Sequence, residues 1–268
     1  MGPLALDPRR RAQFLAPNPP ESTLSKPPID PQTQHAAAVA DAKRLMRLAR
    51  LGALATLDPE TGAPLTTLVG VASDFGGAPL FLMSTLSRHT RHLMNDPRGS
   101  LLLTEQSERG DPLSHPRITL SGLIERTDAK SARTRYLQRN PKARLYADFT
   151  DFSFFLLAIG AVHFNGGFGR ADPLQPADIL SPRDGEAALT EAEPRLIEAV
   201  NAAGDNAVAR LAGHRGSGRR VWRAIGLDSE GLDLSAGSRA ARLQFARPAR
   251  DEAGWKARLA EAAGWQDS

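Results

Sequence analysis

Short β-prone runs separated by turn signals are the feature that most limits how this chain can fold. Five such runs lie between residues 52 and 127: GALATLD, LTTLVGVASD, LFLMST, GSLLLTEQ and PRITLSGLIERT. The segments PETGAP and FGGAP separate the first three runs, and Pro and Gly in such positions favour tight reversals. The pattern therefore predicts a meander of short strands.

Helical spacing flanks this meander on both sides. From His35, apolar residues recur at the spacing of a helix that Gly52 ends, and the segment DAKSARTRYLQRNP predicts a second helix between an Asp128 cap and Pro141. Residues 152–164 are apolar and predict a further buried strand or pair of strands. A β-barrel with helices across its mouths accounts for these elements, in an α+β fold.

A second, smaller region follows the segment LQPADILSPRDG. Thr190 and Glu193 have capping-box spacing, and a helical hairpin is expected from there to Gly213. Three short strands and a helix from about Asp251 to Ala263 complete a small α+β domain, with Trp222 in its core. The predicted division is a disordered Pro-rich tail at 1–34, a barrel domain at 35–175, a linker at 176–188 and the small domain at 189–268.

The absence of cysteine among 268 residues narrows the chemistry. It excludes disulfides, zinc–thiolate sites, iron–sulfur clusters and thiol nucleophiles. The longest apolar run is too short to span a bilayer, and the first residues, MGPLALDPRRR, lack the apolar core of a signal peptide. We therefore expect a cytoplasmic protein that does not interact with a membrane.

Basic residues are concentrated in the middle of the chain. Between Arg88 and Arg144 there are twelve Lys or Arg and six Asp or Glu residues. Such an excess attracts an anionic ligand, although a basic surface that simply faces water is the alternative. Few aromatic residues lie among these charges, so we expect a small-molecule ligand and no nucleic acid.

The segment MSTLSRHTRHLMNDPRGSLLL, residues 83–103, predicts where the anion binds. Ser87 is a suitable N-cap for a helix that the pair Asp96 and Pro97 ends. Arg88 and His89 then lie in the first turn, where cations are unfavourable beside the positive end of the helix dipole unless an anion neutralises them. We therefore predict a phosphate site here, with Arg117 next to it at the start of a strand.

The other histidines are weaker candidates. His92 is on the same helical face as His89, but no carboxylate at suitable spacing completes a metal site, so a surface or phosphate-contact role is preferred and no metal site is predicted. For His163 a hydrogen-bonded core position is preferred to a ligand role. His115 is expected to lie in an exposed loop.

The order of these elements, with the segments LATLDPETGAP, MSTLSRHTRHLMNDPRGSLLL and PRITLSGLIERT, resembles the FMN-binding split-barrel superfamily of pyridoxamine 5'-phosphate oxidases. The segment YADFTDFSFFLLAIGAVHFNGGFGRA and the C-terminal α+β region look most like its HugZ-type branch, some of whose members bind or degrade haem. The resemblance implies an antiparallel split β-barrel with flanking helices, followed by the small α+β domain. It also implies a homodimer whose cofactor site spans two chains.

The resemblance also implies site residues. The family's phosphate contacts correspond to Ser84, Thr85, Ser87, Arg88 and His89, and Thr67 and Arg117 are weaker lining candidates. A glycine turn, NGGFGRA, precedes Arg170, which is a candidate for a carboxylate or propionate contact. True oxidases carry an arginine and a lysine where this chain has Thr67 and Ala72, so pyridoxamine phosphate oxidation is not expected.

Three functions follow as hypotheses. The first is an FMN-dependent oxidoreductase of unknown substrate, because the fold needs little acid–base chemistry of its own when a flavin is bound. The alternative is a haem-binding or haem-degrading HugZ-like protein, with His214 as a candidate iron ligand. The third is a non-catalytic binding module on the same fold.

Overall fold

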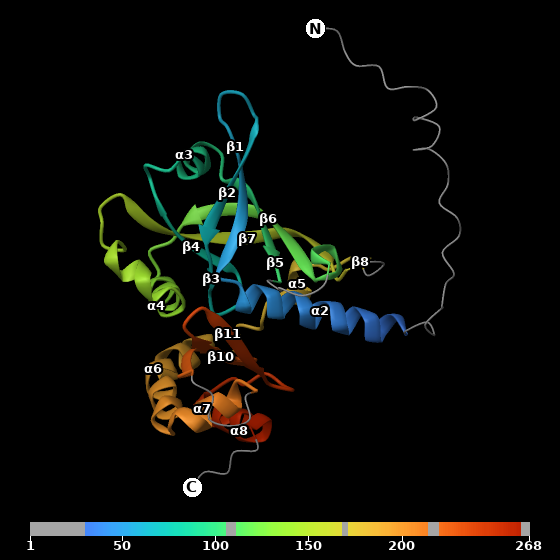
Figure 1. Ribbon diagram of the computed structural model, residues 1–268, viewed down its shortest axis with the longest axis vertical. Coiled ribbons are helices and arrows are strands. Elements are labelled where there is room, and N and C mark those ends of the chain that lie inside the picture. Colours follow the sequence, from blue (N-terminus) through green and yellow to red (C-terminus); the bar gives the residue numbers. More distant parts are fainter. Residues whose placement is uncertain (1–29, 106–110, 168–170, 214–219, 264–268) are drawn as a thin grey trace. The chain divides into compact units, whose positions relative to one another are not determined.

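The structure is a computed structural model that describes residues 30–105, 111–167, 171–213 and 220–263 (Figure 1). The described residues from His35 onward belong to one compact unit, and residues 30–34 fall in the unit before it. Most of the predicted Pro-rich tail lies outside the described residues. Its division from the barrel and the linker at 176–188 stay predictions.

The first described helix begins earlier than its sequence pattern indicated. Helix α2 spans Pro31–Leu48, whereas the spacing predicted a start at His35. The Asp30 carboxylate accepts hydrogen bonds from the backbone N–H and the hydroxyl of Thr33, both at 3.1 Å, and Pro31 occupies the first turn. Both features favour a helix start, so local capping extends the helix beyond its apolar spacing.

The strands of the barrel region form one curled antiparallel sheet, as the sequence predicted. Its order is β2-β1-β5-β6-β7-β4-β3, with β8 paired to β7, in the described part of the chain (Figure 1). The strands are β1 (Leu51–Leu57), β2 (Pro64–Gly70), β3 (Ala72–Ser73), β4 (Pro79–Ser84), β5 (Arg98–Thr104), β6 (Arg117–Arg126), β7 (Phe152–Asn165) and β8 (Ala171–Asp172).

Alternating burial explains why these runs form strands. In β6 the side chains of Ile118, Leu120 and Ile124 enter the core, because every second residue of a strand faces the same side. Leu123 is out of phase with these residues and is exposed. The core also contains Leu54, Phe81, Leu101 and Leu157, from four other strands.

The apolar run after the second helix forms one long strand rather than two. Strand β7 has 14 residues, and its side chains Phe155, Leu157 and Phe164 are buried. Many of the others are partly or fully exposed, so the prediction that the whole run is buried is wrong. Gly160 is an extra residue opposite β6, between the pairs Ser121–Ala161 and Gly122–Ile159, and it forms a β-bulge.

The helices around the sheet begin differently from their predicted caps. Helix α3 (Arg88–Asn95) follows Ser87 as expected, but the Ser87 side chain makes no capping hydrogen bond. Helix α4 (Lys130–Arg139) has Ala129 at its N-cap, so the prediction of an Asp128 cap is wrong. The remaining elements here are the short helices η1 (Pro112–Ser114), η2 (Pro141–Leu145) and α5 (Pro176–Ile179).

The C-terminal region is the small α+β arrangement that the sequence indicated. Helix α6 begins at Glu186, after Gly185, so Thr190 lies inside the helix and the predicted capping box is wrong. Trp222 and Trp255 are buried, and Phe245 packs edge-on against Trp255 with ring centroids 5.7 Å apart. The elements are α6 (Glu186–Ala202), α7 (Asp205–Leu211), β9 (Arg223–Asp228), β10 (Gly231–Ala236), β11 (Arg239–Gln244) and α8 (Glu252–Ala263).

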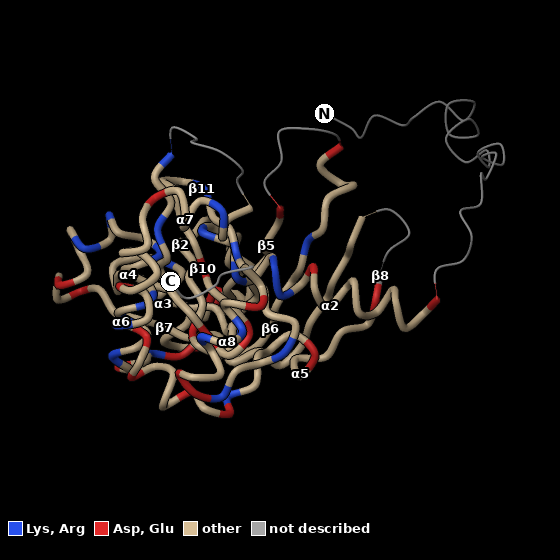
Figure 2. The backbone as a smooth tube through the Cα atoms, turned by 90° about the horizontal axis from the view of Figure 1, so that it is seen from below, with Lys and Arg blue, Asp and Glu red and all other residues tan. Residues whose placement is uncertain are grey.

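Charged residues of both signs are interspersed along the described chain (Figure 2). Several basic residues of the 88–144 segment pair with acids: Arg98 with Asp96 at 2.6 Å and Arg133 with Asp148 at 2.8 Å. These pairs reduce the positive field that the sequence count predicted. Within the described residues, no helix has both the length and the apolar character needed to cross a membrane.

Candidate functional site

The predicted phosphate contacts come together at the start of α3. Ser84 ends β4, Thr85 and Ser87 lie in the following turn, and Arg88 and His89 open the helix. We call these five residues the anion group. Helix α3 packs beside the β1–β2 hairpin, which brings Thr67 of β2 to the helix.

Hydrogen bonds within the chain already engage several of these side chains. The Ser84 hydroxyl donates to the Asp151 carboxylate and accepts the Leu86 backbone N–H at 3.0 Å, and the Thr85 N–H donates to the Asp151 carbonyl at 2.8 Å. Since a hydroxyl has one proton, Ser84 in this arrangement has none left for a phosphate. Asp151 has no local sequence signal that would have identified it.

His89 is a hydrogen-bonding group more than a cation. Its Nδ1 lies 3.1 Å from the Thr67 hydroxyl. Burial, and to a smaller degree the nearby His92, lower the pKa of His89 below its usual value, so the imidazole is neutral at pH 7. The positive charge predicted for the first turn of α3 therefore comes from Arg88, whose side chain is 66% exposed and 3.8 Å from Asp58.

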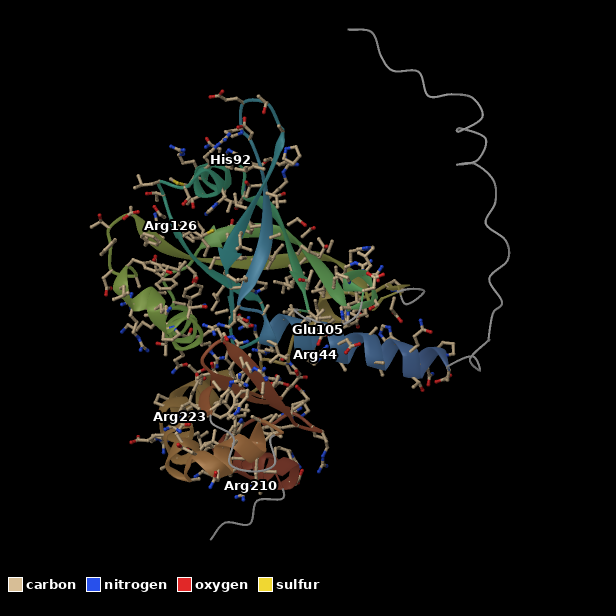
Figure 3. The ribbon with its side chains drawn as sticks, viewed as in Figure 1. Arg44, His92, Glu105, Arg126, Arg210 and Arg223 are labelled. Atoms are coloured by element: carbon tan, nitrogen blue, oxygen red, sulfur yellow. The ribbon has the colours of Figure 1, made fainter. Side chains whose placement is uncertain are left out.

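His92 is buried, which corrects its predicted surface role. Its Nδ1 lies 3.2 Å from the Thr56 hydroxyl and its Nε2 lies 3.5 Å from the Asp58 carboxylate. Figure 3 shows His92 on α3 beside the β1–β2 hairpin. It joins α3 to β1 and to the hairpin turn, where Asp58 accepts the Thr61 N–H at 3.0 Å.

Arg117 does not lie beside the anion group within one chain. It starts β6 and pairs with Thr104 at the far end of β5, whereas α3 is connected to the near end of β5, at Arg98. Six residues of strand separate the two ends by about 20 Å. The prediction that Arg117 lies next to the anion group is therefore wrong for a single chain.

Arg117 instead lies near His163 on the sheet. Thr119, two residues after Arg117, pairs with His163 of β7, and residues two apart on a strand share a face. His163 is exposed, so the prediction of a core histidine is wrong. The Arg117 guanidinium donates to the Leu113 carbonyl at 2.9 Å.

An open hollow of about 360 Å³ lies at strands β7 and β8, and the exposed His163 is one of the residues that line it. Its lining is mostly apolar: Val162, Phe164 and Pro173 join His163 and Asp172. Asp172 pairs with His35 of α2 at 2.9 Å, and this hydrogen bond raises the pKa of His35 above its usual value. The two residues are far apart in sequence, so no local pattern could predict the pair.

A row of side chains leads from this hollow across the sheet. The strand registers place Leu68, Ala53, Leu102, Thr119 and His163 side by side on the face away from the core. Leu68 is 71% exposed and Leu102 is 37% exposed. Figure 3 shows the nearby end of β5, where Glu105 and Arg44 of α2 lie side by side, and these residues form a bidentate pair at 2.9 and 3.1 Å.

Two predicted ligands cannot be placed. Arg170 and His214 lie outside the described residues. The glycine turn before Arg170 is present up to Gly167, whose φ of 108° favours glycine and whose N–H donates to the Asn165 side chain at 2.9 Å. The described residues contain no group of three or more His, Asp or Glu side chains placed to hold a metal ion.

Comparison with known proteins gives a family match over more than half of the chain. The model of the CREG β-barrel family matches residues 31–180. The chain is also similar to the chloroplastic non-canonical haem oxygenase HOZ of Arabidopsis thaliana, with 35% identity over 113 residues. That match covers 41% of this chain and 34% of HOZ, so the chain spans about a third of the length of this relative.

Two solved structures extend the similarity beyond the barrel. A protein of unknown function from Agrobacterium tumefaciens is 32% identical, with a TM-score of 0.74, and the match covers 88% of this chain and all of the other. A haem-binding protein from Mycobacterium smegmatis is 28% identical, with a TM-score of 0.50, and the match covers 85% of this chain and 96% of the other. Both matches reach into the C-terminal region.

Proposed function

This chain belongs to the CREG β-barrel family, and from the geometry of its sheet we propose that it binds haem. The split-barrel family expected from the sequence is thereby confirmed, and the haem alternative becomes our main proposal. The observation that carries it is the exposed His163, which lines an open hollow of about 360 Å³ together with Val162, Phe164, Asp172 and Pro173. Similarity to a haem-binding protein and to a haem oxygenase supports the choice of ligand.

The residues around His163 fit the chemistry of a porphyrin. A porphyrin needs an apolar surface for its ring, a ligand for its iron and cations for its propionates. Leu68 and Leu102 provide exposed apolar area in the row that ends at His163, and hollows of about 300–1,000 Å³ are usual for small-molecule sites. In the proposal His163 holds the iron and Arg117 neutralises a propionate.

Haem, when bound, supplies an iron centre able to react with oxygen. The residues of this chain would orient the haem. His163 would lie at the iron and Arg117 at the propionate edge, and the exposed Leu68 and Leu102, which we call the leucine row, would form a surface that excludes water. Similarity to a protein named as a haem oxygenase makes haem cleavage the reaction to test once binding is measured. We further propose that a second copy of the chain covers the leucine row, giving the homodimer that the family resemblance implied.

Titration of the purified protein with haem tests the proposal. We expect a Soret band typical of histidine-ligated haem, and we expect His163→Ala to weaken haem binding by about tenfold or more. Free imidazole should restore the spectrum of the variant, because it can occupy the vacated position at the iron. Sedimentation of the same samples measures whether the haem-bound species contains two chains.

The imidazole rescue separates a ligand from a structural residue. A loss of binding that imidazole does not restore would assign His163 to the shape of the hollow only. A Soret band unchanged in His163→Ala contradicts its role as iron ligand, and no Soret band in the wild type contradicts haem binding itself. A protein that binds neither haem nor flavin fits the third hypothesis, a binding module for another partner.

FMN is a second candidate, favoured by Arg88. The Arg88 guanidinium is exposed at the first turn of α3, where backbone N–H groups and the helix dipole also attract a phosphate. We expect Arg88→Ala to weaken FMN binding about 10- to 100-fold, as for loss of a charged hydrogen bond to phosphate. Flavin fluorescence quenching measures the affinity.

Arg91→Ala is the matched control for Arg88→Ala. Arg91 is exposed on the same helix but one turn further from its N-terminus, so its loss should change FMN affinity little. If Arg88→Ala binds FMN as well as the wild type does, the anion group does not hold the flavin phosphate.

A further inference from the structure

A small cavity lies among buried arginines between helices α2 and α4 and strands β9 and β10. Arg47, Arg135, Arg139 and Asp233 line it, together with Gly226 of β9. Its volume is about 20 Å³, and a water-sized species needs roughly 10–15 Å³ by the same measure. The cavity therefore has room for one such species.

Local sheet geometry produces this space. Between the pairs Asp233–Gly226 and Leu234–Ala224, strand β9 carries Ile225 as an extra residue, which is a β-bulge. Gly226 then leaves space between groups of both signs: a Cβ there would lie 3.6 Å from a Glu193 carboxylate oxygen, 4.0 Å from the Arg135 guanidinium and 4.0 Å from an Asp233 carboxylate oxygen. A larger residue would fill the space that the glycine leaves.

Positive charge exceeds negative charge around the cavity. Arg47 pairs with Asp228 at 3.1 Å, Arg242 pairs with Asp228 and Asp233 at 2.8 Å, and Arg135 pairs with Glu193 at 3.0 Å. Arg139 donates only to a backbone carbonyl, that of Arg47, at 2.7 Å, among the hydrogen bonds of the described residues. The charged residues that line the cavity and their ion-pair partners thus comprise four guanidinium groups and three carboxylates. A buried charge without a counterion is costly.

Two nitrogen atoms of these arginines are buried without a partner. Within the described residues, neither Arg139 Nη1 nor Arg135 Nε has a hydrogen-bond acceptor, although each side chain is about 94% buried. A buried N–H donor without an acceptor costs about 1–3 kcal/mol, and more for a charged group. Burial also lowers the pKa of Arg139, and an anion beside it would oppose that effect.

We propose that this cavity is a binding site for a small monovalent anion of the chloride class. The unpaired N–H groups of Arg139 and Arg135 donate to it, and its charge balances the excess guanidinium. The small volume favours a single-atom anion over carboxylic acids, sulfate and phosphate. Because Arg135 and Arg139 come from α4 and Gly226 from β9, the anion links the barrel region to the C-terminal sheet.

Crystals of the full chain grown with bromide test the proposal directly, because bromide gives an anomalous X-ray signal. We expect an anomalous peak in the cavity next to Arg139 Nη1. In solution, we expect the thermal midpoint of unfolding to rise by about 5 °C when the chloride concentration is raised from about 1 mM to about 100 mM. Chloride replaces gluconate in this series, so the ionic strength stays constant. Gluconate is too large for the cavity.

Three variants distinguish a bound anion from general salt effects. Arg139→Met removes one donor and the excess charge, and Gly226→Ala places a methyl group in the cavity while all charges remain. Both should lose the bromide peak and the chloride-dependent shift. Arg133→Met on the exposed side of the same helix should keep both, because Arg133 pairs with Asp148 at the surface.

The outcomes separate the proposal from its alternative. Water-like density without anomalous signal, or a chloride shift that persists unchanged in Gly226→Ala, would overturn the anion site. If Arg139→Met does not fold, Gly226→Ala still decides the question, because its added Cβ has only ordinary contacts in this strand.

Discussion

Replacing Asp228 by Asn is expected to destabilise the protein by about 3–5 kcal/mol. The Asp228 side chain is fully buried and accepts from both terminal nitrogens of Arg242, at 2.8 and 2.9 Å. Arg47 Nη2 lies 3.1 Å from Asp228 Oδ2, one of the two oxygens that accept from Arg242. Without the carboxylate, two buried guanidinium groups lose their main counterion, and urea unfolding should show the loss of stability.

The pH dependence of this contribution follows from the pKa of Asp228. Burial alone would raise that pKa, but the guanidinium groups of Arg242 and Arg47 outweigh burial and hold it well below its usual range. A depressed carboxyl pKa contributes stability above the unfolded-state pKa of about 4, and the contribution is lost only as the pH falls through the depressed folded-state pKa. The difference between Asp228→Asn and wild type should therefore stay constant from about pH 5 to neutral pH.

Asp184→Asn is the matched control. Asp184 lies 3.7 Å from Arg250, and both side chains are largely exposed, so breaking this pair should not measurably change stability. If Asp228→Asn unfolds at the same urea concentration as Asp184→Asn, the buried ion pairs of Asp228 with Arg242 and Arg47 do not stabilise the protein.

Gly122→Ala is expected to cost about 3 kcal/mol and to disturb the sheet on which the proposed haem site depends. A Cβ at Gly122 would lie against the Ala158 carbonyl oxygen, far inside van der Waals contact, and 3.0 Å from the Gly160 nitrogen. Both neighbours are backbone atoms of β7, so β6 and β7 would have to move apart. That movement changes the pairing of Thr119 with His163, so haem affinity should fall together with stability.

Gly160→Ala separates this effect from the general cost of replacing glycine in a strand. Gly160 is the bulged residue opposite Gly122, and a Cβ there meets its nearest atom, the Ser121 carbonyl oxygen, at 3.7 Å. Chemical denaturation should place Gly160→Ala close to wild type. Equal destabilisation of the two variants would show that close packing at Gly122 is not the cause.

Much of the fold followed from local sequence patterns. Turn signals and alternating apolar residues predicted the strands from β1 to β6, because both depend on neighbours along the chain. The caps were predicted less well. Asp128 and Thr190 have side chains suited to an N-cap, but α4 and α6 begin elsewhere, since packing selects among several local starts.

The candidate site was only partly predictable. The anion group is contiguous in sequence, so its assembly at the start of α3 could be expected. His35 and Asp172 are brought together by packing of helix α2 near β8, and Ser84 and Asp151 by the pairing of β4 with β7, in both cases over long sequence separations. These pairs decide which side chains of the candidate site remain free to bind a ligand. A single sequence does not reveal such pairs.

The sequence by itself determined the class of fold and the position of the anion group, because both rest on spacing within short segments, and the resemblance of whole segments indicated the family. Only the tertiary structure decided that His163 is exposed in a hollow, that His92 is buried, and that Arg117 lies away from α3 within one chain. It also decided that Arg47, Arg135 and Arg139 meet around a cavity. These outcomes depend on which strands become neighbours and on packing between distant segments, and the periodicity within one segment specifies neither.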